Sequence, residues 1–216
     1  MMDNFEGSVA TVAVIDDDPG VRESLSAILR SIGLQVETYG STQAYLSRDA
    51  SIDPECIVLD IRMPGRNGLD FQDDLARRGD PTSIVILSGY ADVPMSVRAM
   101  KAGATEFLVK PVRAQELLDA VELAISRTRS IRMEVQKIAD LKANFDTLTM
   151  REREIFGHVA AGMMNKNIAA AIGLSEATVK VHRGSVMRKM RARSLADLVR
   201  MADQLGYALK PCYADI

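Results

Sequence analysis

Aspartates that can bind a cation follow two predicted buried strands. Asp16 and Asp17 come directly after the apolar run TVAVI, and Asp60 follows CIVL. The carboxyl ends of parallel strands lie at one edge of a sheet, so these side chains are expected to lie close together. Crowded carboxylates raise one another's pKa unless a cation is present, and oxygen ligands suit a hard ion such as Mg²⁺. The pattern therefore predicts a magnesium site.

A further aspartate, Asp18, directly follows Asp16 and Asp17. Because it stands ahead of Pro19 and Val21, Asp18 is expected to be the N-cap of the next helix. Asp16 and Asp17 are therefore the preferred functional pair. Which of the three carboxylates contacts the metal directly stays open at this level.

Two more polar residues end predicted strands, Ser88 after SIVIL and Lys110 after TEFLV. They add a hydroxyl and an ammonium group to the same edge, which gives a phosphoryl-binding set. An aspartate can attack phosphorus to form an aspartyl-phosphate, while a metal and a lysine offset charge on the transferred oxygens. Taken singly, Ser88 is an ordinary turn residue and Lys110 a surface lysine, so only the combination indicates chemistry.

Short β-branched runs alternate with helical periodicity through the first half of the chain. Strands are predicted at 11–15, 34–39, 56–59, 83–87 and 105–109. Helices are predicted over 21–32, after Ser41, over 69–78, over 93–102 and from Ala114, with Gly33 and Gly103 ending the first and fourth. This alternation predicts an α/β fold with a doubly wound, parallel, five-stranded sheet.

Apolar residues keep roughly helical spacing beyond the last predicted strand, through a charged segment without Pro or Gly. This predicts a long connecting helix, with a linker at 127–144 between a first domain at 1–126 and a second, all-α domain at 145–216. Two interpretations stay open. The helix pairs with a copy of itself, or it is a solvated linker with one stripe packed on its own domains, since too few heptads repeat to indicate a coiled coil.

Short helices alone are predicted after residue 145. The first helix begins at the capping box Thr149–Glu152 and ends at Gly162, and the second begins with Asn165 as its N-cap and runs through Ile172. After the turn at 173–175 the third helix runs to about Met190, and the capping box Ser194–Asp197 begins a fourth that ends at Gly206. The third of these helices is cationic, because residues 175–193 hold six Lys and Arg and one Glu. By helical spacing one face is predicted to pack on the preceding helices: Val179, His182, Val186 and Met190. The outward positions are then Thr178, Lys180, Val181, Ser185 and Arg188.

Composition separates the two halves of the 216-residue chain, which is long enough for two small domains. Residues 1–126 carry 11 Lys and Arg against 20 Asp and Glu, and residues 127–216 carry 16 against 9. The first half suits cations and the second suits phosphate backbones. Cys56 and Cys212 are the only cysteines, so neither a disulfide framework nor a cysteine metal site is expected, and a reducing cytosol fits.

Membrane insertion and export are not expected from this sequence. No apolar run approaches the length that spans a bilayer, and the segment MMDNFEGS lacks a basic stretch followed by an apolar one.

The first half resembles a receiver domain of bacterial two-component response regulators, a flavodoxin-like fold. The matching stretches are VIDDDPGVR, VLDIRMPGRNG, VILSGY and EFLVKP, across residues 9 to about 125. The resemblance implies that Asp60 accepts the phosphoryl group and that Mg²⁺ is bound by Asp16, Asp17, Asp60 and the backbone carbonyl of Arg62. It also implies that Lys110, with a cis bond to Pro111, contacts the phosphoryl group. Ser88 and Phe107 resemble the switch pair of the family.

The second half resembles a LuxR-type helix-turn-helix over about Leu148 to Leu205, a layout that fits the major groove of DNA. The pairing of the two domains is similar to the NarL/FixJ class, and within it to FixJ-like regulators. The resemblance implies that bases are faced by Lys180, Val181 and Gly184, with Ser185 on the same outward surface. It implies phosphate contacts from Asn165, Lys166, Thr178, Arg183 and Arg188. Gly184 departs from a base-reading role, because it has no side chain.

His158 and His182 are more simply interpreted as packing residues than as ligands, since no cysteine or acidic cluster accompanies them in the sequence.

These resemblances imply a cytoplasmic transcription regulator that a sensor histidine kinase phosphorylates on Asp60, and that then forms a homodimer on double-stranded DNA and can contact RNA polymerase. The chain is expected not to be an enzyme, beyond slow autodephosphorylation at most. Two other classes stay open. One is a phosphate-ester hydrolase whose C-terminal helices only dock, and the other is a phosphorelay module whose tail does not bind DNA.

Overall fold

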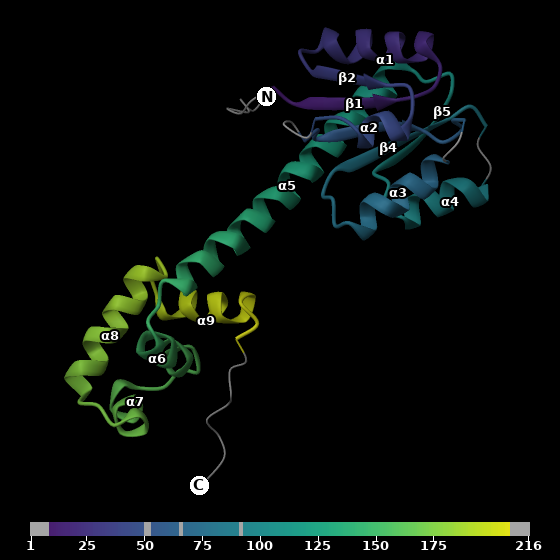
Figure 1. The fold of residues 1–216 in the computed structure, drawn as a ribbon. Helices are drawn as coiled ribbons and strands as arrows, with labels where there is room; N and C mark the ends of the chain where they lie inside the picture. Colours follow the sequence, from purple (N-terminus) through teal and green to yellow (C-terminus); the bar gives the residue numbers. More distant parts are fainter. Residues whose placement is uncertain (1–8, 50–52, 65–66, 91–92, 208–216) are drawn as a thin grey trace. The chain divides into compact units, whose positions relative to one another are not determined.

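The computed structural model describes residues 9–49, 53–64, 67–90 and 93–207, so Cys212 lies outside the described residues (Figure 1). The chain divides into two structural units between Arg132 and Met133. None of the helices in the described ranges is long and apolar enough to cross a membrane.

The first unit contains a sheet of five parallel strands, which confirms the predicted doubly wound fold. The strands are β1 (Thr11–Ile15), β2 (Gln35–Tyr39), β3 (Cys56–Asp60), β4 (Ser83–Ser88) and β5 (Glu106–Val109), in the spatial order β2-β1-β3-β4-β5. From β1 the chain goes to β2 on one side, and it then crosses back to β3 on the other side of β1 and continues to β4 and β5. The direction of winding therefore reverses between β1 and β3, which flank the topological switch point. Both strands are buried along their whole length, as their continuous apolar runs predict.

Two layers of helices cover the sheet because successive strand residues face opposite sides (Figure 1). Val12, Val14 and Val58 pack against α1 (Pro19–Ser31) and α5 (Ala114–Asp146). The alternate residues Ile15 and Ile57 pack in a second core with α2 (Thr42–Leu46), α3 (Gly68–Arg77) and α4 (Val93–Lys101). This arrangement leaves the carboxyl edge of the sheet to the loops that carry the polar residues.

The helix starts follow the capping signals of the sequence. The Asp18 carboxylate accepts hydrogen bonds from the backbone N–H groups of Gly20 and Val21, which confirms its role as the N-cap of α1. The Ser41 hydroxyl accepts from the N–H of Ala44 at the start of α2. Asp18 is thereby engaged with the helix backbone, and this supports Asp16 and Asp17 as the pair available for other chemistry.

Helix α5 is continuous through residues 126 and 144, which confirms the predicted long connecting helix. Hydrogen bonds join residues 128–132 of this helix to the amino ends of the central strands. The N–H of Ser83 donates to the buried Thr128 hydroxyl at 2.8 Å, and the Arg129 guanidinium donates twice to the Glu55 carboxylate, at 2.8 and 3.2 Å. Arg132 donates to the Pro54 carbonyl at 2.8 Å. Side-chain bonds therefore hold the helix to β3 and β4 as far as the boundary of the unit.

The second unit consists of the end of α5 with α6 (Met150–Ala160), α7 (Asn165–Ile172), α8 (Glu176–Lys189) and α9 (Leu195–Gln204). The capping boxes at Thr149–Glu152 and Ser194–Asp197 are confirmed. The prediction that Asn165 caps α7 is wrong. The N-cap is Met164, without a side-chain cap, because the Asn165 amide oxygen accepts a hydrogen bond from Arg183 of α8 at 3.0 Å instead.

Gly68 holds α3 close to the end of β3. A Cβ atom on this residue would lie 2.5 Å from the backbone oxygen of Asp60 and 2.9 Å from Cα of Ile61. Both are backbone atoms that cannot rotate away. We expect Gly68→Ala to lower the free energy of unfolding by about 1–3 kcal/mol in chemical denaturation.

The matched control for this substitution is Gly89→Ala, because a Cβ on Gly89 meets no atom within 4 Å in the described structure. Equal stability of the two variants would contradict the close approach of α3 to β3.

Candidate functional site

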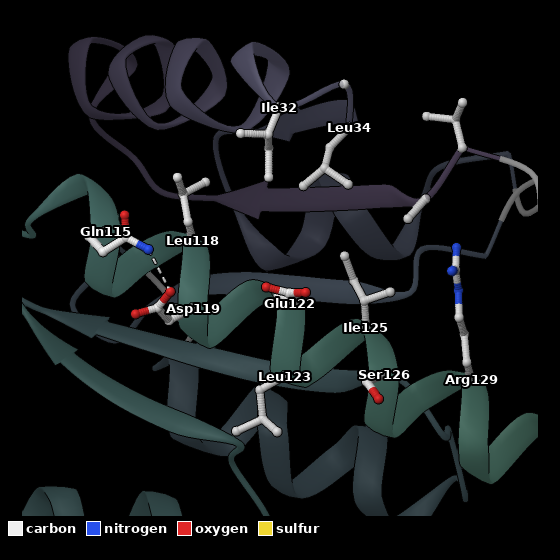
Figure 2. Close-up of a pocket in the computed structure, with 13 residues that line it drawn as sticks. Ile32, Leu34, Gln115, Leu118, Asp119, Glu122, Leu123, Ile125, Ser126 and Arg129 are labelled. Atoms are coloured by element: carbon white, nitrogen blue, oxygen red, sulfur yellow. Dashed lines mark hydrogen bonds between the residues drawn. The ribbon is translucent and has the colours of Figure 1, made fainter. Parts of the chain in front are cut away.

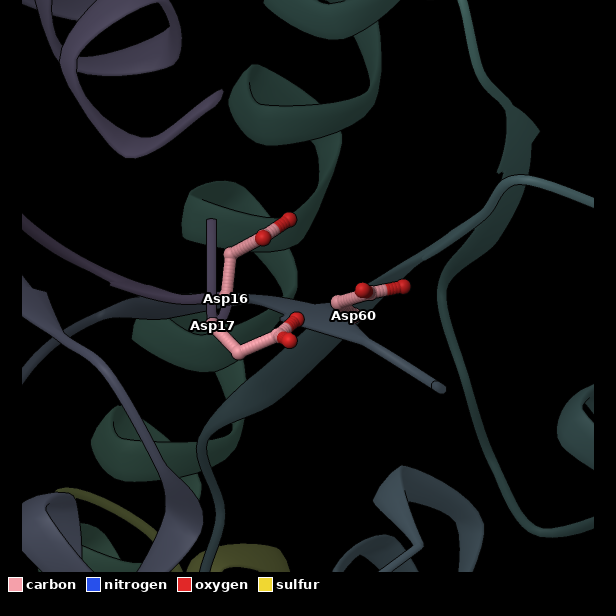
Figure 3. Close-up of side chains that lie close together, drawn as sticks. All are labelled: Asp16, Asp17 and Asp60. Carbon is pink, nitrogen blue, oxygen red and sulfur yellow. The ribbon is translucent and has the colours of Figure 1, made fainter. Parts of the chain in front are cut away.

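Three carboxylates meet at the carboxyl edge of the sheet, as predicted (Figure 3). Asp16 and Asp17 follow β1, and Asp60 ends β3, the strand that pairs with β1. One oxygen from each carboxylate lies within 4.8 Å of the others. Asp16 is 1% exposed and Asp60 6%, whereas Asp17 is exposed. The edge therefore offers two buried oxygen ligands and one that solvent reaches.

Lys110 directly follows β5, and its side chain reaches the carboxylates at this edge. Its Nζ donates to Asp16 Oδ2 at 2.5 Å and lies 3.2 Å from Asp60 Oδ2. The peptide bond from Lys110 to Pro111 is cis, as the resemblance implied. One ammonium group is thus shared by carboxylates that follow or end two different strands.

The environment shifts the pKa values of this pair. Burial raises the pKa of Asp60, and the neighbouring positive charge of Lys110 offsets part of that rise. Burial lowers the pKa of Lys110, but its hydrogen bond to Asp16 and the charge of Asp60 outweigh this effect, so the pKa is raised overall. The lysine is therefore a stable cation beside the carboxylates at neutral pH.

Ser88 and Phe107 stand on the two neighbouring strands. The buried Ser88 hydroxyl donates to the Tyr90 carbonyl at 2.6 Å. The half-buried Phe107 ring packs against the core on the side of α3 and α4. Both residues are therefore engaged with the loop after β4 and the adjoining core, rather than with the three carboxylates.

Arg62 and Tyr90 lie on the loops that follow β3 and β4. The Arg62 N–H donates to Asp60 Oδ1 at 3.4 Å, while its guanidinium lies 5.3 Å from the centre of the Tyr90 ring. Both side chains are exposed. A cation–π contact thus joins these two loops beside the acidic edge.

A separate pocket of about 860 Å³ lies on the face of the sheet that α1 and α5 cover (Figure 2). Ile32 and Leu34 line it from the α1–β2 turn, and Leu118 and Ile125 line it from α5. It shares no residue with the acidic edge. The pocket therefore takes no part in the chemistry that the carboxylates allow.

Helix α8 presents a polar, cationic surface on the side away from its packed residues. Val179, Val186 and Met190 are fully buried, as predicted, and His182 is half-buried. Several of the residues implied to contact DNA are exposed: Lys166 on α7 and Lys180, Val181, Gly184 and Arg188 on α8. Val181, at 72% exposure, has no packing role that accounts for an apolar side chain at this position.

The other implied DNA contacts make bonds inside the unit. Arg183 donates to Asn165, and the Thr178 and Ser175 hydroxyls lie 2.7 Å apart. The Ser185 hydroxyl donates to Glu152 of α6 at 2.6 Å. These residues are half-buried at the margin of the exposed surface, except Ser175, which is exposed.

Glu152, which the sequence predicts only as part of a capping box, also connects α6 to α8. Its carboxylate is 5% exposed and accepts hydrogen bonds from the Ser185 hydroxyl and from Lys189 Nζ, both at 2.6 Å, and from the N–H of Thr149. Lys189 also donates to the Thr147 carbonyl at 3.1 Å. Glu152 thus fixes the azimuth of α8 on α6. The Glu152–Lys189 spacing of 37 residues gave no local signal of this contact.

Comparison with known families identifies both units. Residues 12–122 match the response regulator receiver domain, and residues 146–202 match the bacterial regulatory proteins of the luxR family. Nodulation protein W of Bradyrhizobium diazoefficiens is 50% identical over 197 residues, which cover 91% of this chain and 87% of that protein. The transcriptional regulatory protein FixJ of Azorhizobium caulinodans is 40% identical over 197 residues, covering 91% and 93%.

Among solved structures, the response regulator StyR has a TM-score of 0.81 with 42% identity over 91% of this chain and 100% of that one. A receiver fold followed by a luxR-type unit defines a response regulator that acts on transcription. The chain belongs to this family, in the NarL/FixJ class. This membership implies a kinase partner and DNA binding, and it places the chain among proteins that are mainly signal transducers.

The Glu152 network predicts a pH-dependent stability of the second unit. Burial raises the pKa of Glu152, but the bonds from Lys189, Ser185 and Thr149 lower it to about 2. A depressed pKa contributes stability above the unfolded value near 4.5, and this contribution is lost as the pH falls through 2. We expect Glu152→Gln to lower the free energy of unfolding by about 1–3 kcal/mol at pH 7. The difference from wild type should shrink between pH 4.5 and 2 in denaturant titrations.

Glu154→Gln serves as the control, because Glu154 is exposed and pairs only with the half-exposed Arg151 among the described residues. A constant difference between wild type and Glu152→Gln across this pH range would contradict the ionic role of the carboxylate.

Proposed function

We propose that Asp60 accepts a phosphoryl group from a sensor histidine kinase. The observation that carries this proposal is the buried Asp60 carboxylate at the end of β3, with Lys110 Nζ 3.2 Å away. A bond forms between the Asp60 oxygen and phosphorus as the bond from phosphorus to the kinase histidine nitrogen breaks. Lys110 offsets the charge on the transferred oxygens, and any autodephosphorylation by this site is slow.

Asp16, Asp17, Asp60 and the backbone carbonyl of Arg62 form the proposed Mg²⁺ site. The donor set fits, because three carboxylates with oxygens within 4.8 Å offer the hard oxygen ligands that this ion prefers. When bound, the metal supplies positive charge that stabilises the phosphoryl oxygens. Lys110 already pairs with Asp16, so the exposed Asp17 is the carboxylate most open to the ion.

Ser88 and Phe107 are the proposed switch that senses the phosphoryl group. The Ser88 hydroxyl exchanges the Tyr90 carbonyl for a phosphoryl oxygen, and the Phe107 ring turns inward to fill the space left. The short Ser88–Tyr90 bond and the half-buried ring supply the two groups that this exchange needs. The surface of α4 and β5 rearranges as a result.

The proposed output is a homodimer that places two α8 helices on paired half-sites of double-stranded DNA in the cytoplasm, where it can contact RNA polymerase. Base contacts are assigned to Lys180 and Val181, with Gly184 allowing close approach of the backbone. Phosphate contacts are assigned to Asn165, Lys166, Thr178, Arg183 and Arg188. Ser185 lies at the margin of this surface, where its bond to Glu152 orients α8. The proposed functional divisions remain 1–126, 127–144 and 145–216.

Acetyl phosphate tests the acceptor. With Mg²⁺ present, intact-mass spectrometry of the wild-type chain should show an adduct of about 80 Da that Asp60→Asn lacks. Asp49→Asn is the matched control, because Asp49 is an exposed aspartate of the same unit. Phosphorylation of Asp60→Asn, or none of the wild type, would overturn the assignment.

Two lysines of the proposed DNA surface should differ in their effects. Lys180→Ala should weaken the free energy of DNA binding by about 1–3 kcal/mol and relax sequence specificity at one base position, since Lys180 is assigned to a base edge. Lys166→Ala should weaken binding to all DNA sequences alike, since Lys166 is assigned to a phosphate. It should also reduce the salt slope, which is the slope of log affinity against log salt concentration, by about 1 in magnitude. Affinities on a panel of single-base variants at several salt concentrations separate the two. The same pattern for both variants would contradict the division.

A further inference from the structure

Arg191, directly after α8, occupies a backbone conformation that the chain otherwise reserves for glycine. Its φ is 55°, in the left-handed region, and it is the only non-glycine residue with positive φ among those described. The other described residues with positive φ are all glycines: Gly33, Gly79, Gly103, Gly162, Gly173 and Gly206. A residue with a Cβ is disfavoured in this conformation relative to glycine.

The fold requires this conformation whatever the side chain. The N–H of Arg191 donates to the Arg188 carbonyl at 3.1 Å, and the N–H of Ala192 donates to the Met187 carbonyl at 2.9 Å. These two bonds form the Schellman ending of α8, in which the residue at the turn adopts the left-handed conformation. Glycine would satisfy the same two bonds with less strain.

The Arg191 side chain makes no polar contact with the described residues that would offset this strain. It is exposed and makes no hydrogen bond or ion pair with any residue that the structure describes. The neighbouring carboxylate that could pair with a cation here, Asp197, accepts from the backbone N–H groups of Arg193 and Ser194 and from Arg200. A strained position without an internal contact points to a contact outside the chain.

The position of Arg191 indicates what that contact is. Arg191 comes three residues after the exposed Arg188, just beyond the C-cap Met190, so two exposed arginines lie close together in the sequence where α8 ends. A guanidinium next to the basic last turn of α8 matches the charge and fork geometry of a phosphate group.

We propose that Arg191 is a phosphate-binding residue that extends the DNA surface beyond the end of α8. This inference rests on the proposed DNA binding by α8. The chain keeps arginine at the turn, where glycine would be more stable, because the cation binds the nucleic-acid backbone.

The test measures two quantities that should move in opposite directions in the full-length protein. Arg191→Gly should raise the melting temperature of the second unit by about 4 °C, because it relieves the left-handed strain. The same variant should bind DNA about 5–10-fold more weakly at 0.1 M salt, with a salt slope reduced by about 1. The probe is a labelled duplex that the wild-type protein, treated with acetyl phosphate and Mg²⁺, has selected from a random-sequence pool.

Two further variants complete the test. Arg191→Lys should retain the wild-type salt slope, because it keeps the charge. Lys142→Gln removes one exposed positive charge from α5 in the same unit, outside the proposed DNA surface, and should leave the slope unchanged. Equal affinity and slope for Arg191→Gly and wild type would overturn the inference and leave the proposed function standing. Failure of the wild-type protein to select any duplex would instead overturn the proposed function.

Discussion

The sharing of Lys110 between Asp16 and Asp60 is the interaction on which the first unit depends. Two buried carboxylates from adjacent strands repel each other, and the ammonium group from a third strand offsets that repulsion at 2.5 and 3.2 Å. Asp60 ends β3, and Asp16 and Lys110 directly follow β1 and β5, so the contact also fixes how these strand ends meet. In the proposed function, a phosphoryl group on Asp60 changes this balance by drawing on Lys110, and Ser88 is the proposed residue that responds.

The second unit also contains a buried carboxylate that is paired with a lysine. Glu152 is a buried carboxylate that Lys189, Ser185 and Thr149 satisfy together, and it joins α6 to the helix that carries the DNA surface. A buried charge is costly unless it is fully paired, so such a network permits few alternative positions of α8 on α6. The α8 residues of the proposed DNA surface therefore lie on a helix whose orientation this network fixes.

Helix α5 has a structural role in each unit. Thr128, Arg129 and Arg132 bind the amino ends of β3 and β4, whose carboxyl ends carry Asp60 and Ser88. Its last turns supply Leu141 and Phe145 to the core of the second unit. The strands that bear the proposed phosphorylation site and switch are therefore attached at their opposite ends to the helix that continues toward the DNA-binding unit.

The sequence by itself determined the elements and the set of reactive residues. Alternating apolar runs, Asp18, the Thr149 and Ser194 capping boxes and the position of Asp60 after a buried strand are local signals, because each depends on residues within a few positions. Tertiary structure alone decided the contacts between distant residues. Asn165, the predicted cap of α7, instead accepts a hydrogen bond from Arg183, and the hydroxyl of Ser185, predicted as an outward position, donates to Glu152. Such choices depend on which helix faces which, and no short-range periodicity encodes the packing of two elements against each other.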